Sequence, residues 1–352
     1  MLADNRRTNR KTQICFVVGT LIIGLVASTL NAQKSSGYHL VDTIQVGGEG
    51  GWDALTVDSD AHRLYVSHAT HVVVIDTTTD KVVGDIPNTN GVHDIAIADR
   101  HKRGFTSNGR DNSVTIFDTA TLKATGTVTT GKNPDIMVYD PVSDRVFVFN
   151  GGSNDATVID AAKGTVAGTI AVGGKPEFAV SDGKGDVFVN LEDKSQIATI
   201  DAKKLTVTKR WSIAPGEEPT GLAMDTKAKR LFIVCGNKKM IIMDAESGKV
   251  ITDLPTGGGT DGAEFDPKTK LAFSSNGEGT LTVVQEDSTD KFSVLENVKT
   301  QPRARTMAVD AETHKVYLPT AQFGPVPAPT SAQPRPRAPM IPNSFVILVF
   351  DR

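Results

Sequence analysis

The chain has 352 residues, and its 38 basic and 41 acidic side chains leave a formal charge of −3. This near balance argues against a broad basic surface of the kind that binds nucleic acid. Cys235 is the only cysteine after residue 32, so the rest of the chain can form no internal disulfide.

Residues 1–32 have the pattern of an export signal peptide. The apolar stretch 14–27 is followed by small residues, which place the expected cleavage after Ala32. Its positive region consists of Arg6, Arg7, Arg10 and Lys11. The alternative is an uncleaved membrane anchor, because the apolar stretch approaches spanning length. We therefore expect a periplasmic or secreted protein that contacts the membrane only through this segment, with residues 33–37 as a short linker.

A unit of about forty residues recurs seven times in residues 38–352. Its landmark is a charged residue followed by a short apolar run: RLYVS (63–67), RGFTS (103–107), RVFVF (145–149), DVFVN (186–190), RLFIV (230–234), KLAFS (270–274) and KVYLP (315–319). Each unit holds four strand-like runs separated by turn signals. Seven such units predict an all-β protein, a seven-bladed β-propeller with four antiparallel strands in each blade.

The two ends of the chain are expected to meet in the last blade. The last unit stops after three strands, at Asp351, whereas YHLVDTIQVGG (38–48) has the pattern of a fourth strand. We therefore predict that the N-terminal strand completes the last blade, closes the ring and covers an open sheet edge. In most units the third strand ends in an aspartate, which is expected to cap the following turn.

The segment 131–177, GKNPDIMVYDPVSDRVFVFNGGSNDATVIDAAKGTVAGTIAVGGKPE, resembles the YVTN-type repeat of the YncE-like group of exported bacterial β-propellers. The resemblance extends over residues 38–352 and implies the propeller fold. It implies no particular activity, since similar repeats occur in cytochrome-domain, lactonase and surface-layer propellers. The chain also lacks CxxCH, P-loop and GxSxG motifs, which argues against covalent haem and nucleotide hydrolysis.

Loops that join the outer strand of one blade to the inner strand of the next surround one mouth of a propeller channel. Positions that differ between blades in these loops can build an asymmetric ligand site. The predicted ligand-binding residues are Trp52, Asp53, His93, Asp94, Asp135, Glu177, Glu218, Asp261, Arg303 and Arg305. A structural interpretation stays open, because carboxylates at the mouth can also accept bonds from backbone amides.

A Pro-rich insertion, residues 320–344, separates the second and third strands of the last blade on the same face. Its prolines favour extended polyproline II structure, and long loops in compact domains are often functional. We expect Phe323, Arg335 and Arg337, with Met340, to form a lid over the mouth or a docking arm; a disordered loop is the alternative. The arginines would make a basic sector that can hold an anion.

Three histidines suggest a divalent metal site. His68 and His71 flank a two-residue turn and would face each other, while His93 lies in the next loop on that face. With Asp53 or Asp94 they form a donor set suited to Zn, Cu or Fe. The alternative is a pair of solvated histidines, and no other cofactor is predicted.

The favoured function is binding of a protein, glycan or small molecule in the cell envelope, at the loop face around the channel mouth. The alternative is an enzyme at the same place, either a lactone hydrolase or a metal-dependent oxidoreductase. In the hydrolase, a carboxylate would bind a metal or activate water, His93 would act as acid or base, and Arg303 or Arg305 would stabilise the oxyanion.

Overall fold

The structure is a computed structural model that describes Met1, residues 35–330 and residues 334–352. The predicted signal peptide, residues 1–32, lies outside the described residues except for Met1. In the described part of the chain, no helix combines the length and apolar character needed to cross a membrane.

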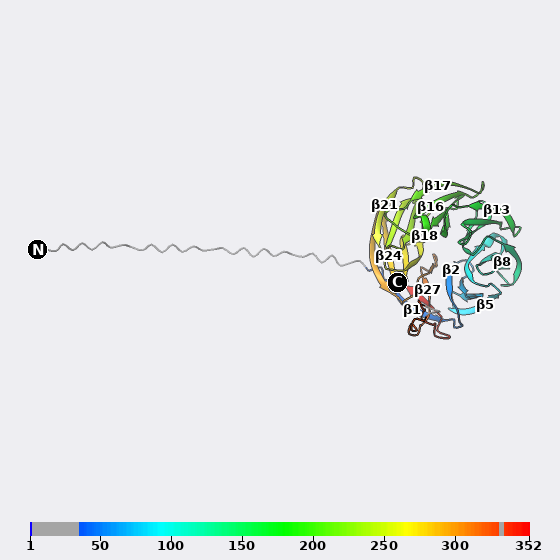
Figure 1. Ribbon diagram of the computed structural model, residues 1–352, viewed down its shortest axis with the longest axis horizontal. Coiled ribbons are helices and arrows are strands. Elements are labelled where there is room, and N and C mark those ends of the chain that lie inside the picture. Colours follow the sequence, from blue (N-terminus) through cyan, green and yellow to red (C-terminus); the bar gives the residue numbers. More distant parts are fainter. Residues whose placement is uncertain (2–34, 331–333) are drawn as a thin grey trace. The chain divides into compact units, whose positions relative to one another are not determined.

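Seven four-stranded antiparallel sheets form a ring, which confirms the predicted seven-bladed β-propeller (Figure 1). Blade 1 contains β2 (Trp52–Asp58), β3 (Arg63–His68), β4 (His71–Asp76) and β5 (Lys81–Pro87). Blade 2 contains β6 (Val92–Ala98), β7 (Arg103–Asn108), β8 (Ser113–Asp118) and β9 (Ala124–Thr129). Blade 3 contains β10 (Pro134–Asp140), β11 (Arg145–Asn150), β12 (Asp155–Asp160) and β13 (Thr165–Ala171).

The chain continues around the ring in the same way. Blade 4 contains β14 (Pro176–Ser181), β15 (Asp186–Leu191), β16 (Gln196–Asp201) and β17 (Thr206–Ser212). Blade 5 contains β18 (Pro219–Asp225), β19 (Arg230–Cys235), β20 (Lys239–Asp244) and β21 (Val250–Pro255). Blade 6 contains β22 (Thr260–Asp266), β23 (Leu271–Asn276), β24 (Thr280–Ser288) and β25 (Lys291–Lys299). Short 3-10 helices occupy turns at η1 (Asp99–His101) and η2 (Glu192–Lys194).

The last blade confirms the predicted ring closure. It contains β26 (Ala308–Val309), β27 (Val316–Thr320), β28 (Val346–Asp351) and, as its outer strand, the N-terminal β1 (His39–Gln45). Tyr38, just before β1, packs edge-to-face on Phe273 of blade 6 with ring centroids 5.3 Å apart. Its hydroxyl donates to the carbonyl of His314 at 2.8 Å. The N-terminal strand therefore ties together the two ends of the ring.

Burial explains why the second and third strands are so apolar. Each blade packs between two others, so the middle strands are covered on both faces, as in β11 and β12. The outer strands are largely exposed and contain few buried residues, as in β13. The inner strands line a central channel cavity of about 470 Å³. Cys235 is also buried. Its burial raises the pKa of its thiol to about 12, as expected for a structural cysteine.

The charged landmark of the repeat joins neighbouring blades. Arg103 donates to the carbonyl of Ala161 at 3.0 Å, and Arg145 donates to the carbonyl of Ala202 at 2.7 Å, in each case in a turn of the next blade. Arg63 and Arg230 make equivalent contacts. We call these four residues the inter-blade arginines.

The other three blades lack an inter-blade arginine. In the last blade the position is taken by Lys315, whose ammonium lies 3.7 Å from a carboxylate oxygen of Asp80 in blade 1. Asp186 stands at the corresponding position of blade 4, because it pairs with Asp201 as Arg145 pairs with Asp160. Beside Asp186 lies a cavity of about 460 Å³ at the boundary with blade 5. In blade 6 the position is taken by Leu271. The first residue of the KLAFS run, Lys270, therefore lies one place before the position of the inter-blade arginines.

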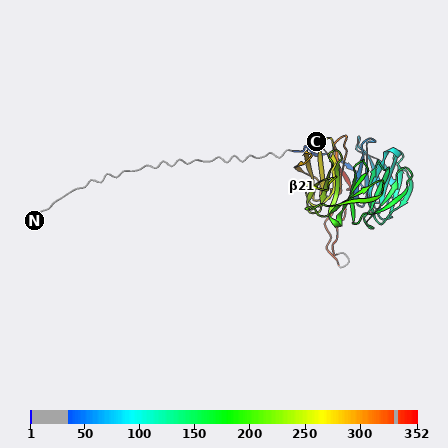
Figure 2. The same cartoon turned by 90° about the horizontal axis from the view of Figure 1, so that it is seen from above.

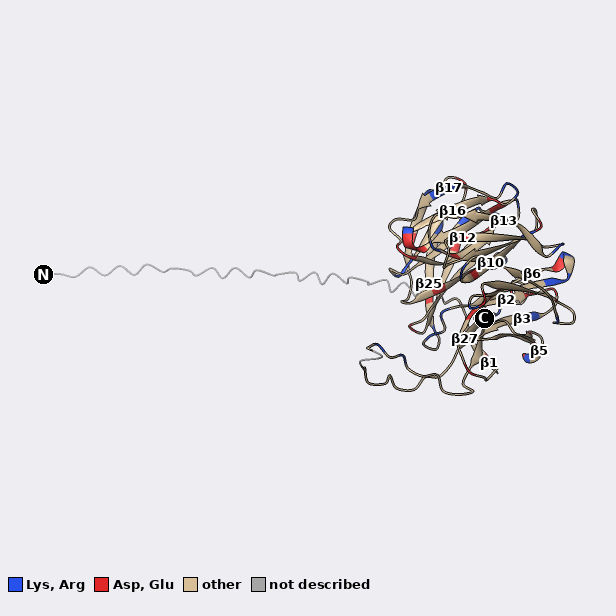
Figure 3. Ribbon diagram, turned by 45° about the vertical axis from the view of Figure 1, so that its right-hand side comes forward, with Lys and Arg blue, Asp and Glu red and all other residues tan. Residues whose placement is uncertain are grey.

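The repeated aspartates cap the turns between the third and fourth strands, as predicted. Asp118 accepts from the amide of Thr121 at 2.7 Å, and Asp160 accepts from the amide of Lys163 at 2.8 Å. Charges of both signs are interspersed over the blades (Figure 3).

Candidate ligand site at the channel mouth

Each blade contributes one residue from the beginning of its inner-strand segment to the channel mouth. These seven residues are equivalent in the repeat, because each lies five positions before the last residue of that segment. We call these residues the mouth ring: Asp53, His93, Asp135, Glu177, Thr220, Asp261 and Arg305. Six of them are among the ten residues predicted from the sequence. Thr220 was missed, although its position in the repeat was the signal that could have identified it.

A β-bulge accompanies the mouth ring in six blades. The register of each inner strand against the second strand shifts within two or three residues, from Trp52 to Leu55 in blade 1 and from Pro134 to Met137 in blade 3. The ring residue lies inside the shifted segment, since Asp53 follows Trp52 and Asp135 follows Pro134. Bulges redirect side chains at the ends of sheets. Here they present chemically different side chains around one opening.

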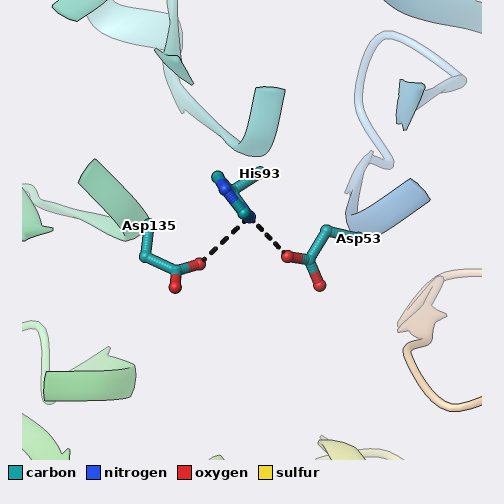
Figure 4. Close-up of side chains that lie close together, drawn as sticks. All are labelled: Asp53, His93 and Asp135. Carbon is teal, nitrogen blue, oxygen red and sulfur yellow. Dashed lines mark hydrogen bonds and ion pairs between the residues drawn. The ribbon is translucent and has the colours of Figure 1, made fainter. Parts of the chain in front are cut away.

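Three ring residues from adjacent blades meet directly (Figure 4). His93 Nδ1 lies 2.6 Å from an oxygen of Asp53 and 3.5 Å from an oxygen of Asp135. Burial alone would lower the pKa of His93, but the hydrogen bond to Asp53 and the charges of both carboxylates raise it to about 9. Burial, with the charge of Asp53, raises the pKa of Asp135 to about 6 despite the opposing effect of His93.

Ion pairs extend this contact to both sides. Arg305 pairs with Asp261 of the preceding blade and lies 3.7 Å from the second oxygen of Asp53. On the other side, Glu177 pairs with Lys175 at 2.7 Å, while burial raises the pKa of Glu177 to about 7. The arc from Asp261 to Asp135 is therefore a continuous chain of charged contacts across five blades.

Two other predicted residues have different surroundings. Asp94 is buried behind the mouth ring, where it accepts from the amides of Ile95 at 2.7 Å and Met137 at 2.8 Å. Burial raises its pKa to about 7. It joins blades 2 and 3, which is the structural role that the sequence left open for these carboxylates. Glu218 is exposed and lies over Gly236, outside the ring.

The Pro-rich insertion has a paired base and projects from one face of the propeller (Figure 2). Phe323 forms an antiparallel bridge with Met340. Gly324 donates to the carbonyl of Pro339 and Ile341 donates to that of Gln322, both at 2.8 Å. The base of the insertion is therefore a short hairpin.

Contacts of Phe323 hold this hairpin against the mouth. The guanidinium of Arg303 lies 3.6 Å from the centre of the Phe323 ring, and Trp52 lies 6.2 Å from it. Trp52 also stacks on Phe345, where the chain enters β28. Aromatic and cation–π contacts of this kind favour a fixed arrangement of the rings.

A cavity of about 580 Å³ lies between the hairpin and the mouth ring. Its apolar wall includes Trp52, Phe323 and Met340, and glycines line much of the rest. Three arginines also line it: Arg303, Arg305 and Arg337. Of the predicted lid residues, Phe323 and Arg337 therefore line the cavity, whereas Arg335 does not; both arginines are exposed.

The three histidines predicted for a metal site fall into two groups. His68 Nδ1 lies 3.2 Å from His71 Nε2 across the turn, and His71 also bonds to Asp85. Burial and the neighbouring His71 lower the pKa of His68 to about 4. His93 instead belongs to the mouth ring. Among the described residues, the three metal-ligating side chains whose donor atoms lie within 4.8 Å of one another are Asp53, His93 and Asp135.

The fold and the charged mouth define a seven-bladed β-propeller with an asymmetric opening. The chain is similar to hydrazine synthase from Kuenenia stuttgartiensis, with 17% identity, 79% of this chain and 94% of that chain covered, and a TM-score of 0.67. It is also similar to U3-55K, at 9% identity over 90% and 99% of the two chains with a TM-score of 0.71. The WD40 repeats of RRP9 match at 9% identity over 91% and 99%, with a TM-score of 0.73. These likenesses concern the fold alone. No protein-family model and no curated protein matches the chain significantly.

Proposed function

We propose that this protein is an exported β-propeller of the cell envelope that binds a small ligand at the channel mouth. The observation that carries the proposal is the 580 Å³ cavity between the mouth ring and the base of the insertion. Its size is in the range of small-molecule sites, and it combines apolar walls with a few charged groups.

The sequence supports the location of this function. A positive segment, an apolar stretch and small residues precede the propeller, and the repeats resemble those of the exported YVTN-type, YncE-like group. We therefore propose a periplasmic or secreted protein. Intact-mass measurement of the protein recovered from the envelope fraction should give a chain that begins at Gln33. A mass that includes residues 1–32 would instead establish a retained anchor.

The binding proposal is tested by filling the cavity. A Cβ atom placed on Gly51 meets no heavy atom within 4 Å, and Gly51 has no left-handed backbone, so Gly51→Leu should fold normally and occupy the site. Gly126→Leu is the matched control, because Gly126 lies on the outer strand β9 and its added Cβ touches only Ile116 of β8. Ligand-observed NMR with a fragment library should give hits for wild type and control that are lost in Gly51→Leu. Identical hits for all three proteins would refute a ligand site at the mouth.

A metal-dependent hydrolase is the second candidate, and the contact of Asp53, His93 and Asp135 favours it. One imidazole nitrogen and two carboxylate oxygens are a donor set for a divalent metal with open positions for water. Donors on such a metal lie roughly 3.0–3.4 Å apart. The separation of 3.5 Å between His93 Nδ1 and Asp135 is close to this range, whereas the hydrogen bond of 2.6 Å to Asp53 would have to lengthen to admit a metal.

In this second candidate, the bound metal would lower the pKa of a water molecule, and Arg305 would stabilise a developing oxyanion beside Asp53. Elemental analysis after equilibration with Zn²⁺ tests the idea. We would compare wild type with Asp135→Asn and with His71→Asn, which changes a histidine outside the triad. Stoichiometric metal that is lost only in Asp135→Asn would support the enzyme, and metal-free wild type would exclude this site.

A further inference from the structure

We infer that the ligand of the mouth cavity is a small amphipathic anion, which consists of a planar apolar body bearing one carboxylate or similar oxyanion. This inference rests on the proposed function and specifies the chemistry of the same cavity. Its basis is the combination of an aromatic wall with two arginines that have no carboxylate partner among the described residues.

The first step concerns charge. Of the three arginines that line the cavity, Arg305 is already paired with Asp261 and lies near Asp53. Within the described part of the chain, Arg303 and Arg337 have no carboxylate at ion-pair distance; Arg303 instead stacks on Phe323. A guanidinium offers a planar fork of donors that matches a carboxylate or another oxyanion. The cavity therefore contains two cationic groups available to an anion.

The second step concerns the backbone of Arg303, which has a left-handed φ of 70°. The same place in the repeat, two residues before the mouth ring, is taken by Gly91 and Gly259 in blades 2 and 6, by Asn133 in blade 3 and by Glu218 in blade 5, all with positive φ. Glycine and asparagine tolerate this conformation best. The left-handed backbone is therefore a feature of this loop in several blades, and in the last blade the residue that adopts it is an arginine that lines the cavity.

The third step concerns order. The Arg303 amide donates to the carbonyl of Gly277 at 2.7 Å, and the guanidinium is stacked 3.6 Å from the centre of Phe323. The side chain is therefore fixed before a ligand arrives, while its N–H edge can still donate. A group ordered in advance loses less conformational entropy on binding.

The fourth step concerns size and shape. A cavity of about 580 Å³ is much larger than a bare carboxylate or phosphate needs. The remaining wall is apolar and aromatic, formed by Trp52, Phe323 and Met340, and Gly51 leaves room for a flat ring to lie close to the backbone. The apolar body of the ligand would occupy this part.

The fifth step limits the charge of the ligand. Asp53 and Asp261 stand beside Arg305 on the ring side of the cavity and already balance that arginine. A second anionic group on the ligand would meet these carboxylates, and like charges at close range are a strong means of exclusion. The ligand is therefore a monoanion whose charged end faces the insertion.

The test is calorimetric titration with three matched probes: 2-naphthoate, its neutral isostere 2-naphthamide, and acetate. We expect 2-naphthoate to bind wild-type protein about tenfold more tightly than 2-naphthamide, since a charge-assisted hydrogen bond at a partly exposed site is worth about that much. Acetate should give no saturable binding. Equal affinity for the two naphthyl probes, or tight binding of acetate, would overturn the inference.

Variants locate the charge. Arg303→Gln and Arg337→Gln should each weaken 2-naphthoate about tenfold and leave 2-naphthamide unchanged, which also shows that the cavity is intact. Arg335→Gln, on the same insertion but outside the cavity, is the control and should change neither. If both naphthyl probes bind equally and Gly51→Leu abolishes both, the proposed function stands and the anion inference falls. If no probe binds at millimolar concentration, both fall.

Discussion

Replacement of His93 by asparagine is expected to destabilise the propeller at neutral pH and to have much less effect above about pH 9. Asparagine can keep a donor near the position of His93 Nδ1, which contacts Asp53 at 2.6 Å and Asp135 at 3.5 Å, but it carries no charge. The variant therefore removes the positive charge that lies between these two carboxylates while conserving most of the packing.

The magnitude follows from the pKa of His93, which is raised from 6.5 to about 9 in the folded protein. This difference corresponds to at most about 3 kcal/mol of stability. The side chain is 29% exposed, so solvent screening reduces the expected value to about 2 kcal/mol. Because folding raises the pKa of His93, its charged imidazole contributes its full stabilisation below pH 6.5. That contribution is lost as the pH rises through about 9.

Urea unfolding of wild type and His93→Asn at several values between about pH 6 and about pH 10 measures this contribution directly. The difference in unfolding free energy should fall by about 2 kcal/mol across that range. Taking the difference between the two proteins cancels the titration of groups that the substitution does not affect. A difference that stays constant with pH would refute a charged His93 in the folded state.

Three further predictions concern the scaffold. Arg145→Met removes bonds to the carbonyls of Ala202 and Lys203 and should cost about 1.5–3 kcal/mol in urea unfolding; no measurable loss would show that the inter-blade arginines do not hold the blades together. Asp186→Arg should supply the missing contact at the boundary of blades 4 and 5 and raise the Tm, whereas a lower Tm would contradict this account of the cavity there. Buried Cys235, with a pKa of about 12, should react with Ellman's reagent only after unfolding, and rapid reaction in the native protein would contradict its burial.

The propeller could be predicted because its determinants are local and repeated. The RLYVS-type runs mark the second strand of every blade. The pattern of residues 38–48 matches the fourth strand that is missing from the last repeat unit. The inter-blade contact of the charged landmark residue was not predictable from the sequence, because Arg145 bonds to a turn that lies 57 residues further along the chain. Pairing register, which places Leu271 and not Lys270 at that position, also appears only in the folded sheet.

The candidate site was predictable in part, for a similar reason. Equivalent loops identified Asp53, His93, Asp135 and Arg305, because repeat symmetry places equivalent residues around one opening. The sequence does not reveal which neighbours meet, since the bulges at the starts of the inner strands set the directions of these side chains. Thus His93 joins Asp135 and not His68, although the hairpin geometry correctly brings His68 and His71 together.

The insertion shows the same limit. Its prolines and arginines indicated a lid or a docking arm, but the pairing of Phe323 with Met340 depends on a hairpin whose two sides lie 17 residues apart. That pairing decides that Phe323 and Arg337 line the cavity and that Arg335 does not. The composition of the insertion does not distinguish Arg335 from Arg337.

Crystallographic fragment screening of the propeller would test the central claim most directly. Soaking with a library that contains amphipathic anions and their neutral isosteres should place bound fragments between Trp52, Arg303 and Phe323, with the anionic group near Arg303 or Arg337. Fragments that gather instead in the central channel or in the cavity beside Asp186, with the mouth cavity empty, would contradict the account.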